Sequence, residues 1–243
     1  MKCRECRRLY RDREAEAKTV SGFVSGKKTG RENPTRKPDI LSTGARNTMM
    51  KITARRNGDW ILTHSGTHFW PLDPRPEEIL IDDIAHSLSN QCRFTGHVRS
   101  FYSVAEHSLH VSWLCDEDKV EAMWGLLHDA SEAYLVDLPR PLKHHSEFGA
   151  PYRTVEAGLM RCIAERFSLP PDEPESVSKA DKVMLGIEAR DLMGAGADPA
   201  WQKWIKLIGK CERSVADPLT PSHAKTLFLW RYHSLAQEIS RTR

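Results

Sequence analysis

The segment Trp124–Lys143, WGLLHDASEAYLVDLPRPLK, is the stretch around which the rest of the chain is interpreted. Ahead of its histidine, apolar residues recur at the spacing of a buried helix face: Val120, Met123, Trp124 and Leu127. The segment then places His128, Asp129 and Glu132 close together at one end of the predicted helix. Ionisable groups on a buried face are unfavourable unless they pair with one another or bind a metal. We therefore expect a functional site at this helix end.

The dipeptide His128-Asp129 offers a divalent cation one imidazole nitrogen and one carboxylate oxygen, a mixed donor set that suits Mn, Fe, Co, Ni or Zn. Two ligands do not hold a catalytic metal, so further donors are expected elsewhere. His107 lies on the buried side of one predicted helix, and Asp181 lies on the apolar stripe of another that begins at Ser178. Taken singly, they are also compatible with a packed core histidine and a surface aspartate near a helix N-terminus.

Charge divides the 243-residue chain into two parts. Residues 1–50 carry 13 Lys/Arg against 6 Asp/Glu, whereas residues 51–243 carry 23 against 27. The basic, polar residues 1–50 lack apolar periodicity and predict a disordered extension, and residues 51–243 predict one globular domain. The mildly acidic domain does not suggest a nucleic-acid partner, which leaves only the basic extension suited to such a contact.

The remaining composition favours a cytoplasmic protein without a membrane anchor. No apolar run reaches the length of about 18 residues that a membrane span needs, and the charged first residues do not resemble a secretory signal. The six cysteines are scattered, which suits a reducing compartment better than a disulfide framework. Cys3 and Cys6 have zinc-site spacing, but no second pair completes four ligands, so we interpret them as reduced cysteines.

The globular part predicts an all-α fold with one short β-hairpin. The hairpin spans Asp59–Trp70 and turns at Ser65-Gly66. Prolines, caps and apolar periodicity predict the helices: over Glu77–Asn90, from the capping pattern Ser103-Val-Ala-Glu106, through His128, over Phe148–Phe167, from Ser178, and over Pro221–Ser240.

The order of His107, His128-Asp129 and Asp181 resembles the H…HD…D pattern of the HD-domain metal-dependent phosphohydrolases. The likeness extends to four separated motifs: Val-Ala-Glu-His107-Ser, His128-Asp-Ala-Ser-Glu132, Asp137-Leu-Pro-Arg-Pro-Leu-Lys143 and Ala180-Asp181-Lys182. In order and spacing these motifs look like the 5′-deoxynucleotidase branch, and the phage deoxyadenosine-triphosphate triphosphohydrolases are similar. The resemblance covers residues 77–195 and implies an HD-domain helical bundle.

For the metal and the chemistry, the resemblance implies one divalent ion, which is Co, Mn, Zn, Fe or Mg. Such an ion lowers the pKa of a bound water and polarises a phosphoryl group. The resemblance also implies that Glu132 orients the attacking water or assists proton transfer, and that Asp137 is a second acid near the sugar and the leaving oxygen. The implied metal ligands are His107, His128, Asp129 and Asp181.

For the substrate, the resemblance implies that Arg93 grips the phosphate as a planar bidentate donor, with Lys143 as a second cationic ligand. Phe94 follows the arginine, where the nucleotidases have a tryptophan. The gap from Arg93 to His107 also differs from the nucleotidase pattern. Both departures bear on the selection of deoxyribose over ribose.

The expected function is hydrolysis of a (deoxy)nucleoside 5′-phosphate, a small-molecule substrate, with release of phosphate or triphosphate. One alternative is another HD reaction on a cyclic nucleotide or a guanosine alarmone, against which the absence of an obvious two-metal histidine set counts. A second alternative is a non-catalytic nucleotide-binding module with a basic tail. The base, the number of phosphates, the identity of the metal and a homo-oligomeric state all stay open at this point.

Overall fold

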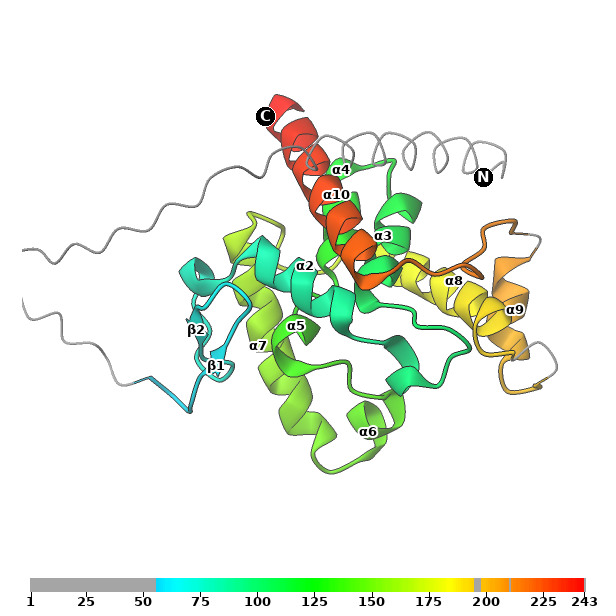
Figure 1. Cartoon of the computed structure of the whole chain (residues 1–243), viewed down its shortest axis with the longest axis horizontal. Helices are drawn as coiled ribbons and strands as arrows, with labels where there is room; N and C mark the ends of the chain where they lie inside the picture. Colours follow the sequence, from blue (N-terminus) through cyan, green and yellow to red (C-terminus); the bar gives the residue numbers. More distant parts are fainter. Residues whose placement is uncertain (1–55, 195–197, 210, 243) are drawn as a thin grey trace, which may run out of the picture.

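The structure of the chain is a computed structural model that describes residues 56–194, 198–209 and 211–242 (Figure 1). The extension predicted over residues 1–50, its cysteines Cys3 and Cys6, and the domain boundary after residue 50 lie outside the described residues. Within them the fold is helical with a single two-stranded antiparallel sheet. This confirms the predicted all-α class with a short hairpin. No described helix has the length and apolar character needed to cross a membrane.

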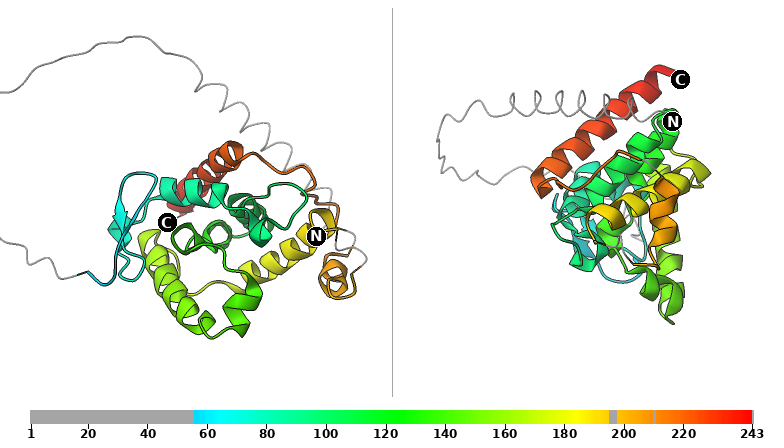
Figure 2. Two further views of the ribbon diagram at one scale, coloured as in Figure 1. Left: turned by 60° about the horizontal axis from the view of Figure 1, so that its bottom comes forward. Right: turned by 90° about the vertical axis from the view of Figure 1, so that its right-hand side faces the viewer.

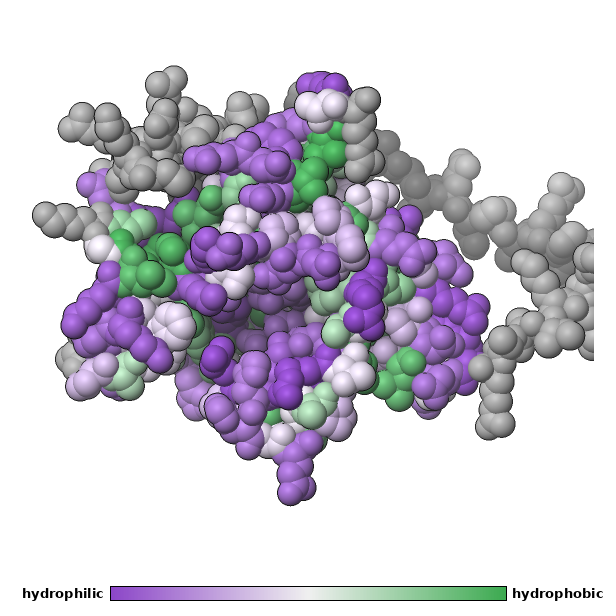
Figure 3. All heavy atoms as spheres, turned by 180° about the vertical axis from the view of Figure 1, so that it is seen from behind, coloured by the Kyte–Doolittle hydropathy of each residue, from purple (hydrophilic) through white to green (hydrophobic). Residues whose placement is uncertain are grey.

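The elements follow one another in this order: β1 (Ile61–Leu62), β2 (His68–Phe69), the 3-10 helix η1 (Pro76–Glu78), α2 (Ile81–Asn90), the 3-10 helix η2 (Arg93–Gly96), α3 (Val104–Leu114), α4 (Lys119–Leu127), α5 (Glu132–Leu135), α6 (Arg140–His145), α7 (Gly149–Arg166), α8 (Glu175–Asp191), α9 (Gln202–Ile208) and α10 (Pro221–Thr242). Helix α3 packs against α2, α4, α8 and α10, and α8 also contacts α4 and α9 (Figures 1 and 2). The face seen from behind is mostly hydrophilic with small, separate apolar patches (Figure 3).

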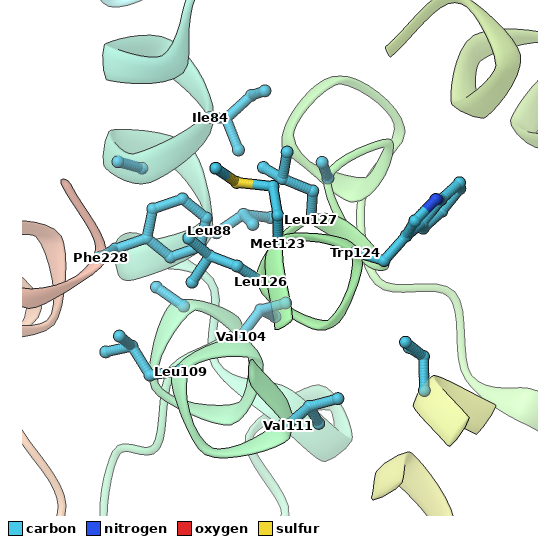
Figure 4. Close-up of a cluster of buried hydrophobic side chains, with 14 of the residues drawn as sticks. Ile84, Leu88, Val104, Leu109, Val111, Met123, Trp124, Leu126, Leu127 and Phe228 are labelled. Carbon is cyan, nitrogen blue, oxygen red and sulfur yellow. The ribbon is translucent and has the colours of Figure 1, made fainter. Parts of the chain in front are cut away.

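Helices α3 and α4 form the centre of the molecule. All residues of Val104–Ser112 and of Ala122–Leu127 are buried, so this part of α4 is covered on every side rather than on the one face that its periodicity predicts. Gly125 permits the close approach of the two helices, because a Cβ there would lie 3.1 Å from the Ser112 backbone. Apolar side chains of α2, α3, α4 and α10 gather around this contact (Figure 4).

Two of the predicted helices are interrupted. The helix expected over residues 77–90 is split, because Ile79 and Leu80 are extended between η1 and α2. The helix expected through His128 ends at Leu127, and a turn follows before α5 begins at Glu132. The sequence expectation that one helix end carries His128, Asp129 and Glu132 was therefore wrong, although the turn keeps them close.

The helix starts show how far local signals reach. The Ser103 hydroxyl accepts a hydrogen bond from the Glu106 amide at 3.1 Å, which confirms the predicted cap of α3. The Glu106 carboxylate accepts from the Leu219 amide at 2.9 Å, so it ties α3 to the segment before α10 rather than closing a capping box. Helix α8 begins at Glu175, directly after Pro174, and not at Ser178 as expected.

Candidate metal centre

The loop before α3 carries Arg93 to the site. An isolated antiparallel bridge joins Cys92 to Ser103 and closes this loop on itself. Phe94 and Thr95, the next residues, both have φ 55°. This left-handed conformation costs residues with a side chain roughly 1–3 kcal/mol and persists only when the surroundings impose it. The Arg93 guanidinium lies against the Phe94 ring, with 5.3 Å between its carbon and the ring centroid.

Four donor groups from three separate parts of the chain meet at one point. His107 comes from α3, His128 and Asp129 from the turn after α4, and Asp181 from α8. The two Nε2 atoms of the histidines are 3.3 Å apart. His107 Nε2 lies 3.2 Å from Asp181 Oδ1 and 3.7 Å from Asp129 Oδ2. The remaining short distance, 3.2 Å, joins His128 Nε2 to Asp129 Oδ2.

These separations fit donors that share one ion. Two bonds of about 2.1 Å that meet at roughly 100° place their donor atoms about 3.2 Å apart. His107, His128 and Asp129 each present one ligand atom within 4.8 Å of the others. Asp181 extends this set through its contact with His107, so the donor chemistry and spacing suit a divalent transition metal.

The other ring nitrogen of each histidine is held by an acceptor. His107 Nδ1 lies 2.6 Å from the Glu188 carboxylate, and His128 Nδ1 lies 2.9 Å from the Gly125 carbonyl. A carboxylate and a carbonyl only accept, so each Nδ1 carries the hydrogen and donates it. The Nε2 atoms of both rings are thereby directed at the same point, as a shared metal ion would require.

The charges around the two histidines compensate for their burial. Burial lowers the pKa of His128, but Asp129 and Asp181 outweigh this effect and raise it to about 9. Burial raises the pKa of the Asp129 carboxyl, but His128, His107 and Arg93 hold it well below its usual range. His128 therefore carries an additional proton at neutral pH, which a divalent cation has to displace.

Two further acids lie beside the donors. Glu132 is 7% exposed, and among the described residues its Oε2 has no hydrogen-bond partner. Burial, followed by the charges of Asp129 and Asp137, raises the pKa of Glu132 well above its ordinary value. Burial also raises the pKa of Asp137; Arg93 opposes this rise and Asp129 adds to it. Burial therefore favours the protonated form of Glu132, which is the form suited to donate a proton.

The amide side chain of Gln91 links the backbone at Glu132 to the backbone at Asp137. Its Nε2 donates to the Glu132 carbonyl at 2.9 Å, and its Oε1 accepts from the Asp137 amide at 3.2 Å. Gln91 directly follows the last residue of α2, and its backbone carbonyl accepts a hydrogen bond from the Val104 amide at 3.1 Å. One residue therefore connects α2, α3 and the loop that carries Asp137.

The chain was compared with known proteins, and no protein-family model matches it. It is 39% identical over 178 residues to the uncharacterized protein YfdR of Escherichia coli strain K12, in an alignment that covers 73% of this chain and 96% of YfdR. The chain belongs to the YfdR family. Another member, the uncharacterized protein RCAP_rcc00048 of Rhodobacter capsulatus, is 32% identical over 193 residues, which cover 74% of this chain and 97% of that protein.

Membership of the YfdR family assigns no activity, so function has to be argued from the placement of side chains. In this YfdR-family chain the four predicted ligands lie together, and Arg93 contacts Asp129 with 3.4 Å between Nη1 and Oδ2. Lys143, expected to bind phosphate, pairs with Glu156 of α7 at 2.6 Å. The roles predicted for these residues, as metal ligands, as acids and as phosphate-binding groups, stay predictions.

Sequence reasoning assigned no role to Gln91 or Glu188 in this YfdR-family chain. Glu188 lies on the α8 stripe that contains Asp181, and this position was the only available signal. Its partner His107 is 81 residues away, and the Gln91 contacts to Glu132 and Asp137 span 41 and 46 residues. No local pattern reports contacts at such separations.

Proposed function

We propose that the protein is a metal-dependent phosphohydrolase of the HD type that acts on (deoxy)nucleoside 5′-phosphates and releases phosphate or triphosphate. The observation that carries this proposal is the convergence of two histidine Nε2 atoms, 3.3 Å apart, with two carboxylates from separate elements. A buried arginine and a buried glutamate of raised pKa beside this cluster support a phosphoryl substrate. A cytoplasmic location, suggested by the scattered cysteines, is part of the same proposal.

His107, His128, Asp129 and Asp181 would hold the ion. When bound, a divalent metal supplies a water of lowered pKa and polarises a phosphoryl oxygen. Imidazole and carboxylate donors suit Mn, Fe, Co and Zn, and the carboxylates alone suit Mg. The Glu188 carboxylate and the Gly125 carbonyl hold the Nδ1 hydrogens, so both rings are already oriented with Nε2 toward the ion and only a proton has to leave.

Arg93 would bind the phosphate. Its side chain is 12% exposed, and its Nε is buried without a hydrogen-bond partner among the described residues. An unpaired buried donor is unfavourable unless a ligand completes it, and the planar guanidinium matches phosphate oxygens in pairs. Asp129 and Glu188 hold the η nitrogens at 3.4 and 3.3 Å, which fixes the plane of the guanidinium.

Glu132 would transfer the proton. Burial raises the pKa of its carboxyl well above the ordinary value and so favours the protonated form. That form would donate its proton to the leaving oxygen as the bond from phosphorus to this oxygen breaks and the bond from phosphorus to the water oxygen forms, while the proton of the attacking water passes to solvent. Asp137, held beside it through Gln91, would lie near the sugar and the leaving oxygen. The acids thereby serve the leaving group, whereas the histidines serve the ion.

A panel of substrates tests this function. The metal-free chain is supplied with Mn, Co or Mg. The substrates are deoxyribo- and ribonucleoside mono- and triphosphates, a cyclic nucleotide and a guanosine alarmone. The product, phosphate or triphosphate, is then identified. We expect metal-dependent release from the 5′-phosphates by the wild-type chain and none by His128→Ala. His64→Ala is the matched control, because His64 lines a separate hollow of about 460 Å³. Turnover of only the cyclic nucleotide or the alarmone would contradict the assigned substrate class.

A further inference from the structure

Glu188 is a fully buried carboxylate that neither binds the ion nor transfers a proton in the proposed reaction. It lies in α8 with 0% of its surface exposed. A buried carboxylate is strongly unfavourable unless it is paired. Its Oε1 accepts from His107 Nδ1 at 2.6 Å, and its Oε2 forms an ion pair with Arg93 Nη2 at 3.3 Å. One buried group thus contacts both a proposed metal ligand and the arginine proposed to bind the phosphate.

The position of Glu188 on α8 explains how it reaches the site. Asp181 and Glu188 are seven residues apart, so they lie two turns from each other on the same side of the helix. Asp181 contacts His107 at Nε2, with 3.2 Å between the atoms, and Glu188 contacts the same ring at Nδ1. Helix α8 therefore contacts the His107 imidazole at both nitrogens, and the short contact of Nδ1 with Glu188 fixes the orientation of the ring.

We propose that Glu188 is a positioning residue that aligns His107 and Arg93 with each other, so that the ion and the phosphate are received in a fixed relation. This inference rests on the proposed function. Loss of an outer carboxylate that orients a metal-bound histidine typically weakens metal affinity roughly 10–100-fold. Because Glu188 also holds Arg93, its loss should weaken phosphate binding together with metal binding. A substitution of Arg93 alone should weaken only phosphate binding.

The test compares two buried glutamates. Glu188→Gln keeps the shape of the side chain and removes the charge that pairs with Arg93. Glu106→Gln is the matched control: Glu106 is 2% exposed and adjacent to His107 in sequence, but its carboxylate accepts from the Leu219 amide. Cobalt binding to each metal-free full chain is followed by calorimetry and by the visible absorption of the bound ion. Inorganic phosphate is then titrated into each cobalt-loaded chain.

We expect the Kd for cobalt to rise roughly 10–100-fold in Glu188→Gln, with an altered cobalt spectrum and weaker phosphate binding. Glu106→Gln should keep the wild-type Kd and spectrum. Wild-type affinity and spectrum in Glu188→Gln would overturn the proposal. A wild-type chain that binds cobalt but hydrolyses no nucleotide would overturn the proposed function alone, because the ratio of the cobalt Kd values would still decide the role of Glu188.

A measurement on the unmodified chain decides the matter if Glu188→Gln does not fold. Histidine ¹⁵N NMR of the zinc-loaded wild-type chain reports which nitrogen of His107 carries the hydrogen. We expect the hydrogen on Nδ1, in a strong hydrogen bond to Glu188. A His107 ring that is protonated on Nε2, or that carries its Nδ1 hydrogen without this bond, would overturn the positioning role.

Discussion

Replacing Glu132 by glutamine separates proton transfer from metal binding. The side chain is 7% exposed, its Oε2 has no hydrogen-bond partner in the described part of the chain, and burial raises the pKa of the carboxyl well above its ordinary value. Glutamine is neutral and of similar size, so it matches the protonated form that burial favours. Gln91 bonds the backbone carbonyl of Glu132, so the start of α5 does not depend on the side chain. We expect the free energy of unfolding to change by no more than about 1 kcal/mol.

The effect on the chemical step should be much larger. Loss of a general acid or base slows a reaction by roughly 10²–10⁴, which corresponds to about 3–5 kcal/mol in the activation free energy. Asp181 is the comparison, because its carboxylate lies 3.2 Å from His107 Nε2 within the donor cluster. Asp181→Ala should lose the ion itself, and activity with it.

Elemental analysis and kcat are measured side by side for both variants. The expected result is a Glu132→Gln protein that contains its metal, melts near the wild-type temperature and turns over slowly. Asp181→Ala should contain little metal. If Glu132→Gln lost the metal while Asp181→Ala kept it, the two roles would have to be exchanged. Unchanged kcat in Glu132→Gln would remove Glu132 from the mechanism.

Three further predictions follow from particular contacts. Because the pKa of His128 is raised to about 9, the ring is protonated below that pH and competes with the ion, so metal affinity should fall as the pH falls from 9 and level off above it. Calorimetry in two buffers of different ionisation enthalpy counts the protons released, and metal uptake without proton release at pH 7 would contradict the assignment. Arg93→Lys keeps the charge but loses the planar guanidinium, so KM for the nucleotide should rise about tenfold or more while the metal content stays constant. An unchanged KM would mean that the phosphate binds elsewhere. In Gly125→Ala the new Cβ would lie 3.1 Å from the Ser112 backbone. The free energy of unfolding, measured by urea titration, should therefore fall by roughly 1–3 kcal/mol. An unchanged free energy of unfolding would mean that α3 and α4 are not closely packed.

Much of the fold was predictable from local signals. Helical periodicity and the cap at Ser103 predicted α3, and the prolines around Pro174 marked the approach to α8. The burial of α4 on all sides was not predictable, since it depends on three neighbouring helices that periodicity does not report. The break after Leu127 was also missed, because the apolar spacing and the charged residues are equally compatible with a continuous helix.

Of the residues in the candidate site, some were predictable from local sequence signals and others depend on tertiary packing. The candidate donors His107, His128, Asp129 and Asp181 were predicted because ionisable residues at apolar helix positions are conspicuous and their order resembles a known family. Glu188 occupies such a position too, but its proposed role depends on which side chain of α3 it meets. That contact is set by the packing of α8 against α3, which the sequence alone does not specify.

Metal dependence of nucleotide hydrolysis is the most direct test of the central claim. The full chain is stripped of metal with a chelator, assayed for phosphate release from nucleoside 5′-phosphates, and assayed again after addition of one equivalent of Mn or Co. We predict no release without the ion and recovery with it, in the wild-type chain and not in Asp129→Ala. Undiminished turnover by the metal-free protein would contradict the account.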